Sequence, residues 1–156
     1  MHLDMCFPRE IEKARENRTP VVIVGGTVEY HAAHLGYGCD TLIPLCLVEK
    51  LAEKKDIIIA PPISYTPASW GVAGEESGTI HVDEVVFEGY LYDIFSSMLS
   101  AGLRNIYAVL FHQIDSPNPM PMTASFMKAA KRATAAAVKP RRCHFCPLRL
   151  SMLSRQ

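Results

Sequence analysis

Residues 21–26 read VVIVGG, and this short stretch decides the fold. Four β-branched residues in a row are typical of a strand that is buried on both faces of a parallel sheet, and the glycine pair closes it. Comparable apolar runs follow at residues 57–60 (IIIA) and 106–111 (IYAVLF). We therefore expect three buried strands in one sheet.

Helical patterns separate these runs. Residues 9–18 are mostly charged, as in a solvated helix, whereas residues 41–54 and 86–99 carry apolar side chains at helical spacing. Residues 122–138 are rich in alanine and predict a fourth helix. Strands that alternate with helices predict an α/β fold of three layers, in which a mainly parallel sheet is flanked by helices.

The start of the helix over residues 41–54 bears on the chemistry. A proline is tolerated in the first turn of a helix, so Pro44 favours Thr41 as the N-cap and leaves Asp40 just outside, with its carboxylate free. The second long helix has Asp83 as its predicted N-cap. Between these helices, residues 64–78 form a long loop without periodicity, which we interpret as substrate-facing.

Composition limits the class of protein. Of the 156 residues, 49% are hydrophobic and 21% charged, which predicts one globular domain, assigned to residues 1–138. The 16 basic and 16 acidic side chains cancel, so nucleic acid is not an expected partner. No apolar run is long enough for a membrane span, there is no signal-peptide pattern, and the five cysteines are odd in number. The cytoplasm is the expected location.

Four potential metal ligands follow the predicted strands. Glu29 and His31 come after the first strand, Asp40 precedes a helix, and His112 ends the third strand. In a parallel sheet these positions share the carboxyl edge, where ligands bind. Carboxylates and imidazoles are the ligands of hydrolytic metal sites, and a carboxylate such as Asp40 could bridge two ions. Spacing alone equally allows ordinary loop residues and a helix-start aspartate.

Four further residues are candidates for supporting or catalytic roles. His34 is expected to hydrogen-bond a metal ligand rather than bind metal, and Trp70 could line a substrate pocket, although packing explains it equally well. Glu75 could act as an acid or base, against the more common role of a solvated loop glutamate. Cys39 could be a nucleophile, but no sequence feature distinguishes it from an inert thiol.

The chain resembles the creatininase (creatinine amidohydrolase) family. That family has a glycine turn before Glu-x-His-Gly-Pro-His and then Asp-Thr, in a fixed order with later motifs. The matching stretches are GGTVEYHAAHL (25–35), CDT (39–41), PP (61–62), GTI (78–80), and GLRNI (102–106) leading to His112. The resemblance extends over roughly residues 18–130.

The resemblance implies a dinuclear zinc or manganese centre, a small-molecule substrate and a homo-oligomer, frequently a hexamer. Glu29 and His112 would bind one metal and His31 the other, with Asp40 as the bridge. Asp115 is the candidate for the remaining ligand. The expected reaction is hydrolysis of a small cyclic amide, or a related ring carbonyl compound, by metal-activated water.

Two departures from the family pattern matter. Residues 32–33 are Ala-Ala instead of Gly-Pro, and residues 139–156 form a basic tail, KPRRCHFCPLRLSMLSRQ, where the family continues with further strands. We hypothesise that this tail arises from a shifted reading frame or a truncated gene, so that the C-terminal part is missing or replaced. Its CxxC pair, Cys143 and Cys146, is half of a zinc site at most.

Two alternatives to a cyclic amide hydrolase remain open. The stretch YGCDTLIP (37–44) and the pair His112-Gln113 resemble the branch of 3-dehydro-scyllo-inosose hydrolases, which cleave a carbon–carbon bond in a ring. The other alternative is a truncated, non-catalytic family remnant that folds and oligomerises.

Overall fold

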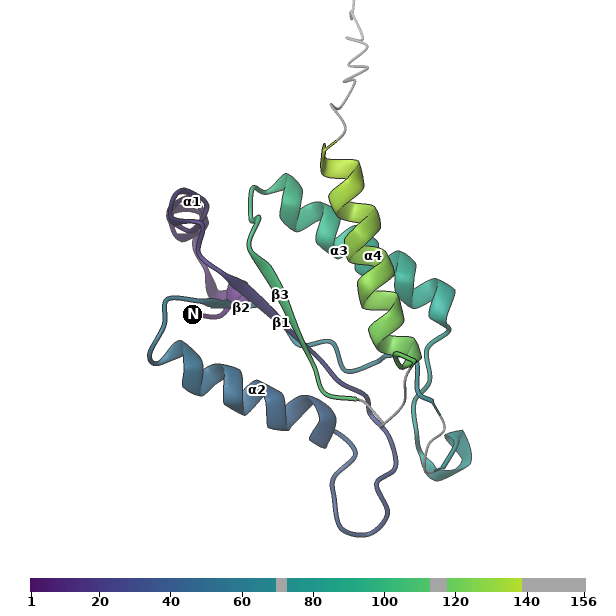
Figure 1. Ribbon diagram of the computed structural model, residues 1–156. Helices are drawn as coiled ribbons and strands as arrows, with labels where there is room; N and C mark the ends of the chain where they lie inside the picture. Colours follow the sequence, from purple (N-terminus) through teal and green to yellow (C-terminus); the bar gives the residue numbers. More distant parts are fainter. Residues whose placement is uncertain (70–72, 113–117, 139–156) are drawn as a thin grey trace, which may run out of the picture.

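The computed structural model describes residues 1–69, 73–112 and 118–138 of the chain. Its centre is a sheet of three parallel strands in the order β2-β1-β3 (Figure 1), formed by β1 (Val21–Gly25), β2 (Ile58–Ile59) and β3 (Ile106–Leu110). Val21 pairs with Ile58 on one side and with Ile106 on the other. The central strand β1 is buried along its whole length.

Helices cover both faces of the sheet. They are α1 (Pro8–Asn17), α2 (Cys39–Ala52), α3 (Glu84–Ser100) and α4 (Pro121–Val138), with short 3-10 helices η1 (Leu3–Met5) and η2 (Glu75–Ser77). α2 lies on one side of the strands, and α3 and α4 lie together on the other (Figure 1). The predicted three-layer α/β fold is confirmed. Among the described residues, no helix has both the length and the apolar character needed to cross a membrane.

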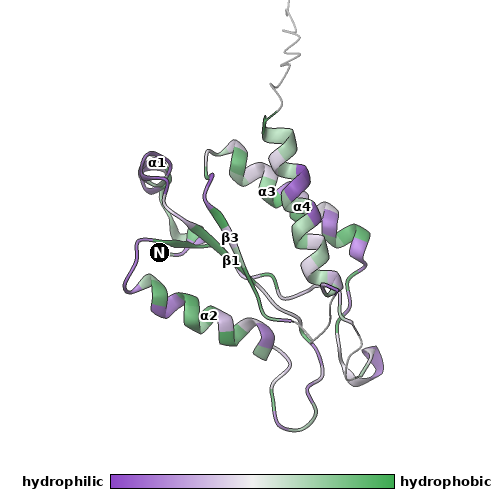
Figure 2. Cartoon of the chain, in the orientation of Figure 1, coloured by the Kyte–Doolittle hydropathy of each residue, from purple (hydrophilic) through white to green (hydrophobic). Residues whose placement is uncertain are grey.

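The alternation of side chains along β1 divides the core in two. Val22 and Val24 pack with Val48 of α2, whereas Val21 and Ile23 belong to the larger cluster that contains Phe87 and the other buried side chains of α3 and α4. Figure 2 shows that the strands are largely hydrophobic, whereas the helices carry both hydrophobic and hydrophilic residues. β1 thus lies at the middle of both halves of the core.

The strand β3 differs from its prediction. We expected a buried strand, but Tyr107 is 54% exposed, and the strand as a whole is only partly buried. β3 lies at the edge of the described sheet, and α2 packs mainly on β1 and β2, so the apolar sequence of β3 does not translate into burial. The predicted helix N-cap Asp83, in contrast, is confirmed: its Oδ1 accepts hydrogen bonds from the backbone N–H groups of Val85 (2.8 Å) and Val86 (3.1 Å).

The predicted N-cap of α2, Thr41, is wrong by three residues. Gly38 is the N-cap, and its carbonyl accepts hydrogen bonds from the N–H groups of Thr41 and Leu42. Asp40 therefore lies in the first turn of the helix, not outside it. Pro44 lies inside the helix and has no N–H to donate to the carbonyl of Asp40. Proline was an unsafe marker of the helix start because one missing hydrogen bond near the N-terminus is tolerated.

Gly26 allows α2 to approach the end of β1. A Cβ atom at this position would lie 2.5 Å from both the carbonyl carbon and the carbonyl oxygen of Asp40. Both contacts are with backbone atoms, which a side-chain rotation cannot relieve. The absence of a side chain at Gly26 therefore sets how close the first turn of α2 comes to the sheet.

We predict that Gly26→Ala destabilises the fold by about 1–3 kcal/mol, because the added methyl group forces helix and strand apart. The matched control is Gly36→Ala, where a Cβ would meet no atom within 4 Å. This control should change the free energy of unfolding by less than about 0.5 kcal/mol. Urea unfolding followed by circular dichroism measures both. Equal effects of the two substitutions would contradict the proposed role of Gly26.

Candidate metal centre

The side chains of Glu29, His31, Asp40 and His112 meet beyond the carboxyl ends of β1 and β3. Glu29 and His31 lie on the segment that continues from β1, Asp40 comes from the first turn of α2, and His112 follows β3. Because β1 and β3 are parallel neighbours, their ends deliver these residues to one edge. The backbone N–H of Phe111 donates to the carbonyl of Gly25, which extends this pairing to the edge of the site.

His112 lies against both carboxylates. Its Nδ1 atom is 3.0 Å from Oδ2 of Asp40 and 3.2 Å from Oε1 of Glu29. Ligand atoms of the three residues all lie within 4.8 Å of one another, and all three residues are buried. The other ring nitrogen of His112, Nε2, is buried and has no hydrogen-bond partner among the described residues. These three residues form the buried half of the cluster.

His31 lies on the other side of the same carboxylates. Its Nε2 atom is 3.3 Å from Oδ1 of Asp40 and 3.5 Å from Oε1 of Glu29. Its Nδ1 atom lies 3.1 Å from the backbone carbonyl oxygen of Glu29, which accepts a hydrogen bond when Nδ1 is protonated. That tautomer leaves the lone pair of Nε2 directed at the carboxylates, the arrangement common for metal-binding histidines.

Threonine hydroxyls hold the backbone between β1 and the site. Thr27 and Thr66 are fully buried and share a hydrogen bond of 2.7 Å, while the Thr66 hydroxyl donates to the carbonyl of Gly26. Thr79 Oγ1 accepts from the N–H of Tyr30. These hydroxyls, which the sequence did not mark, add to the backbone hydrogen bonds that continue past β1, in which Val28 donates to Ser64 and Glu29 donates to Tyr37, and so help to keep Glu29 in place.

The negative charges of the buried carboxylates favour the binding of a cation. Glu29 and Asp40 are buried carboxylates, and among the described residues neither forms an ion pair with lysine or arginine. Burial of two acids at one place is unfavourable unless a positive charge compensates them. The surrounding ligand types are imidazole nitrogen and carboxylate oxygen, which suit divalent ions such as Zn²⁺. The donor set therefore fits a metal.

Cys39 lies at the edge of the cluster. Its Sγ atom is 3.6 Å from Nε2 of His31 and 3.6 Å from Oδ1 of Asp40. Burial raises the pKa of its thiol above the ordinary value, and the negative charges of Asp40 and, more weakly, Glu29 raise it further. The sequence alone did not distinguish Cys39 from an inert thiol. Its position directly before Asp40 was the available signal of its proximity.

Two of the other predicted site residues are described, and both lie outside this cluster. His34 lies in an exposed turn, and Glu75, in η2, is also exposed. Trp70 and Asp115 lie outside the described residues. The roles predicted for these four residues stay predictions.

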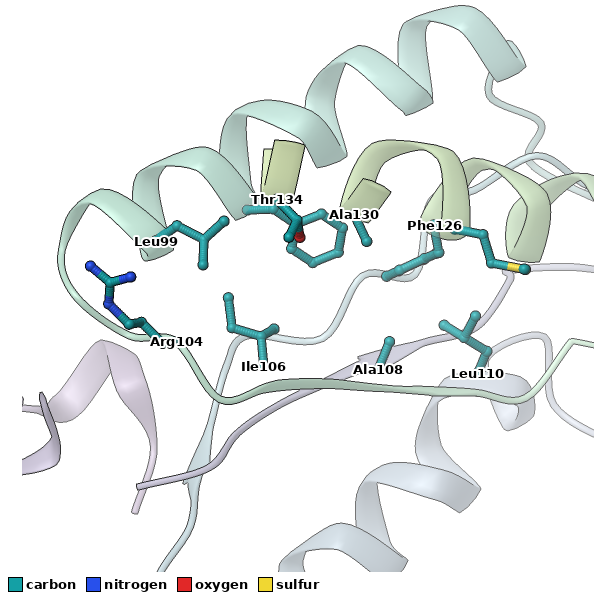
Figure 3. A pocket seen from close by; sticks show the side chains of 10 residues that line it. Leu99, Arg104, Ile106, Ala108, Leu110, Phe126, Ala130 and Thr134 are labelled. Carbon is teal, nitrogen blue, oxygen red and sulfur yellow. The ribbon is translucent and has the colours of Figure 1, made fainter. Parts of the chain in front are cut away.

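A groove of about 350 Å³ lies between β3 and the pair α3 and α4, away from these ligands (Figure 3). Its walls are mainly apolar, with Leu99, Ile106, Leu110 and Phe126 among them, and Arg104 is the one charged residue among the described residues that line it. None of the clustered carboxylates or imidazoles lines it. It lacks the groups that a hydrolytic site requires.

Comparison with known proteins identifies the family of the chain. The family model Creatininase, described as creatinine amidohydrolase, matches residues 6–154. The chain therefore belongs to the creatininase family. The match runs into residues 139–154, which the sequence analysis placed outside the domain; the domain boundary stays a prediction. A search of curated proteins found no match.

Solved creatininase structures share the fold. A structure of creatinine amidohydrolase has a TM-score of 0.75 and 16% identity, with 86% of this chain and 51% of that chain covered. A structure titled creatininase Mn has a TM-score of 0.74 and 17% identity over 86% and 51%. A mutant creatininase of Zn-Zn type has a TM-score of 0.71 and 18% identity, with 88% of this chain and 54% of that chain covered. This chain spans about half the length of these structures.

Ala32 carries local backbone strain beside His31. Its φ angle is 57°, in the left-handed region that favours glycine, and the family motif has glycine at this position. Because Ala32 is exposed, removal of its methyl group forfeits little packing. The strain is thus a local cost of the Ala-Ala sequence in the turn after His31.

We predict that Ala32→Gly leaves the free energy of unfolding unchanged or raises it by up to about 1 kcal/mol, since relief of strain outweighs the greater freedom of the unfolded chain. The neighbouring substitution Ala33→Gly is the control, because Ala33 is also exposed but has no positive φ angle. It should lower stability by about 0.4–1 kcal/mol. A larger loss for Ala32→Gly than for Ala33→Gly would contradict this interpretation.

Proposed function

We propose that Glu29, His31, Asp40 and His112 form the two-metal centre of a hydrolase that opens a small cyclic amide. One observation carries the proposal: the two carboxylate oxygens of Asp40 face different histidines. Oδ2 lies 3.0 Å from His112, and Oδ1 lies 3.3 Å from His31. A carboxylate placed in this way can give one oxygen to each of two ions.

The residues divide into two sets of ligands. Glu29, Asp40 and His112 would hold one divalent ion, and His31 and Asp40 would hold the second. Zinc and manganese are the expected metals, in agreement with the Mn and Zn-Zn forms of the similar solved structures. When bound, such ions polarise a carbonyl group and make water a stronger nucleophile near neutral pH.

The protein's own residues prepare the site for this chemistry. The carboxylates supply two negative charges to balance the cations, and their burial limits competition from water. The hydrogen bond between His31 and the carbonyl of Glu29 orients one imidazole, and the Thr27–Thr66 pair holds the backbone below it. These contacts fix the ligands before metal binds, which lowers the cost of assembling the site.

Further parts of the proposal rest on the sequence. Asp115 is proposed as the remaining metal ligand, with Trp70, Glu75 and His34 near the substrate or the ligands. A cyclic amide is favoured by the description of the family as creatinine amidohydrolase; ring cleavage of a 3-dehydro-scyllo-inosose type of compound is the alternative. Cytoplasmic location and assembly into a homo-oligomer, a hexamer as in the family, complete the proposal.

The test begins with the metal content of the purified chain. After removal of metal and dialysis against zinc or manganese, elemental analysis should find two ions per chain. Asp40→Asn should reduce both occupancies and weaken affinity by at least about 100-fold, because loss of even an indirect metal partner costs 10- to 100-fold. The control Glu53→Gln changes an exposed acid at the other end of α2 and should bind as the parent does.

Turnover is measured on the same samples. Formation of creatine from creatinine would support the cyclic amide substrate, and turnover of the inosose compound alone would support the other branch. Two bound ions without turnover of either compound would favour the non-catalytic alternative. The absence of stoichiometric metal, or equal metal binding by Asp40→Asn and the parent, would overturn the two-metal centre itself.

A further inference from the structure

We propose that Cys39 is a third ligand, through its sulfur atom, of the ion held by His31 and Asp40, so that this position selects zinc over manganese. The inference rests on the proposed function, which assigns only His31 and Asp40 to this ion. It gives the two metal positions different chemistry: oxygen and nitrogen ligands at Glu29 and His112, and an added sulfur ligand at the other.

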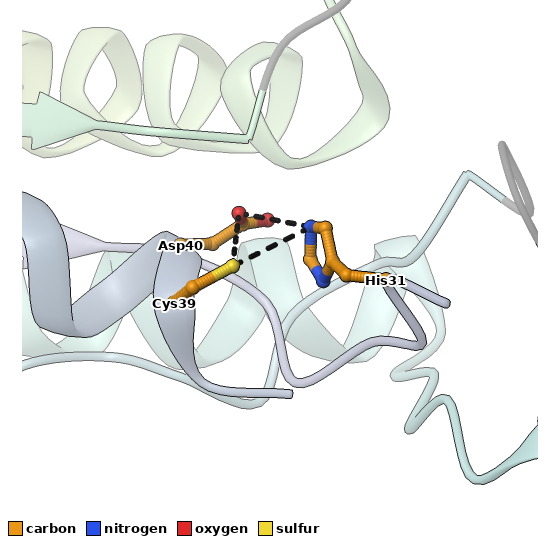
Figure 4. A group of neighbouring side chains, drawn as sticks. All are labelled: His31, Cys39 and Asp40. Atoms are coloured by element: carbon orange, nitrogen blue, oxygen red, sulfur yellow. Dashed lines mark hydrogen bonds and ion pairs between the residues drawn. The ribbon is translucent and has the colours of Figure 1, made fainter. Parts of the chain in front are cut away.

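The three ligand atoms have the spacing of a zinc site. Figure 4 shows the sulfur of Cys39, the carboxylate of Asp40 and the ring of His31 pointing toward a common centre. The distances between them are 3.6 Å from Sγ to Nε2, 3.6 Å from Sγ to Oδ1 and 3.3 Å from Nε2 to Oδ1. The atoms form a nearly regular triangle.

Tetrahedral geometry predicts almost the same triangle. With bonds of about 2.3 Å to sulfur and about 2.0–2.1 Å to nitrogen and oxygen, tetrahedral ligands lie about 3.5–3.6 Å apart when one is sulfur. A nitrogen and an oxygen ligand lie about 3.4 Å apart. All three observed distances agree with these values to about 0.1 Å. The three side chains therefore already have the mutual spacing of ligands around one tetrahedral ion.

The backbone supports this arrangement. Cys39 and Asp40 are the first two residues of α2, so the same helical turn positions the sulfur and the bridging carboxylate. His31 is oriented independently by its Nδ1 contact with the carbonyl of Glu29. On coordination, the S–H bond breaks, its proton passes to solvent, and the sulfur forms the bond to the metal. No redox change is involved.

The sulfur ligand determines which metal is preferred. Thiolates bind zinc strongly, whereas manganese prefers carboxylate, carbonyl and water oxygens. The position that contains Cys39 should therefore retain zinc in the presence of excess manganese. The position formed by Glu29, Asp40 and His112 has no sulfur ligand among the described residues and lacks this bias.

X-ray absorption spectroscopy of the zinc-loaded full chain tests the ligand directly. The parent for this experiment carries Cys143→Ser and Cys146→Ser, so that the tail cannot supply sulfur. We expect zinc–sulfur scattering at about 2.3 Å, its loss in Cys39→Ser, and its retention in Cys46→Ser, which changes an exposed cysteine of the same helix. In competition, Cys39→Ser should lower the preference for zinc over manganese at least about tenfold.

The outcomes separate this inference from the proposed function. Two zinc ions per chain with only nitrogen and oxygen scattering would overturn the role of Cys39 and leave the two-metal centre intact. Sulfur scattering that persists in Cys39→Ser would also overturn it. A chain that binds no stoichiometric zinc would overturn both. The parent spectrum decides whether any sulfur is bound, and comparison of Cys39→Ser with Cys46→Ser, both checked for native circular dichroism, decides whether Cys39 supplies it.

Discussion

The site depends on the burial of Asp40 between two imidazoles. Its carboxylate is 9% exposed and lies within 3.3 Å of ring nitrogens of both His31 and His112. A second buried acid, Glu29, approaches the same two rings. Such a concentration of charge is stable only with compensation, so the arrangement makes physical sense as a cation site prepared by the fold.

The approach of α2 to β1 makes this burial possible. Asp40 reaches the imidazoles because the helix begins against Gly26, where no side chain separates the two backbones. Both histidines come close to Asp40 because β1 is the central strand. His31 lies on the continuation of β1, and His112 follows the neighbouring strand β3. The packing of α2 against the sheet therefore also determines the geometry of the charged cluster.

Much of the architecture could be predicted from local patterns. The β-branched run of residues 21–24 and the capping carboxylate of Asp83 behave as expected, because each depends on its immediate neighbours. The partial exposure of β3 could not be predicted in this way, because the sequence of an apolar strand does not show which elements pack on it. Tyr107 of β3, for example, is exposed although its neighbours in the sequence are apolar.

The candidate site was predictable to a similar degree. Four potential ligands could be placed at one edge by strand order, but the position of Cys39 depends on where α2 begins. The sequence suggested Thr41 as the cap, which left both Cys39 and Asp40 outside the helix and did not fix the direction of either side chain. The hydroxyl pairs of Thr27 and Thr66 join segments far apart in the chain, and nothing local marks them.

The contact between Asp40 and His112 joins residues 72 positions apart. Such a contact exists only after β3 has docked beside β1, so high affinity for a cation is a property of the folded chain and not of the segment around Asp40. Zinc or manganese in the medium would then act as a folding ligand, which draws the population toward the native state by mass action. The resistance of this protein to heat would accordingly vary with the supply of metal around it.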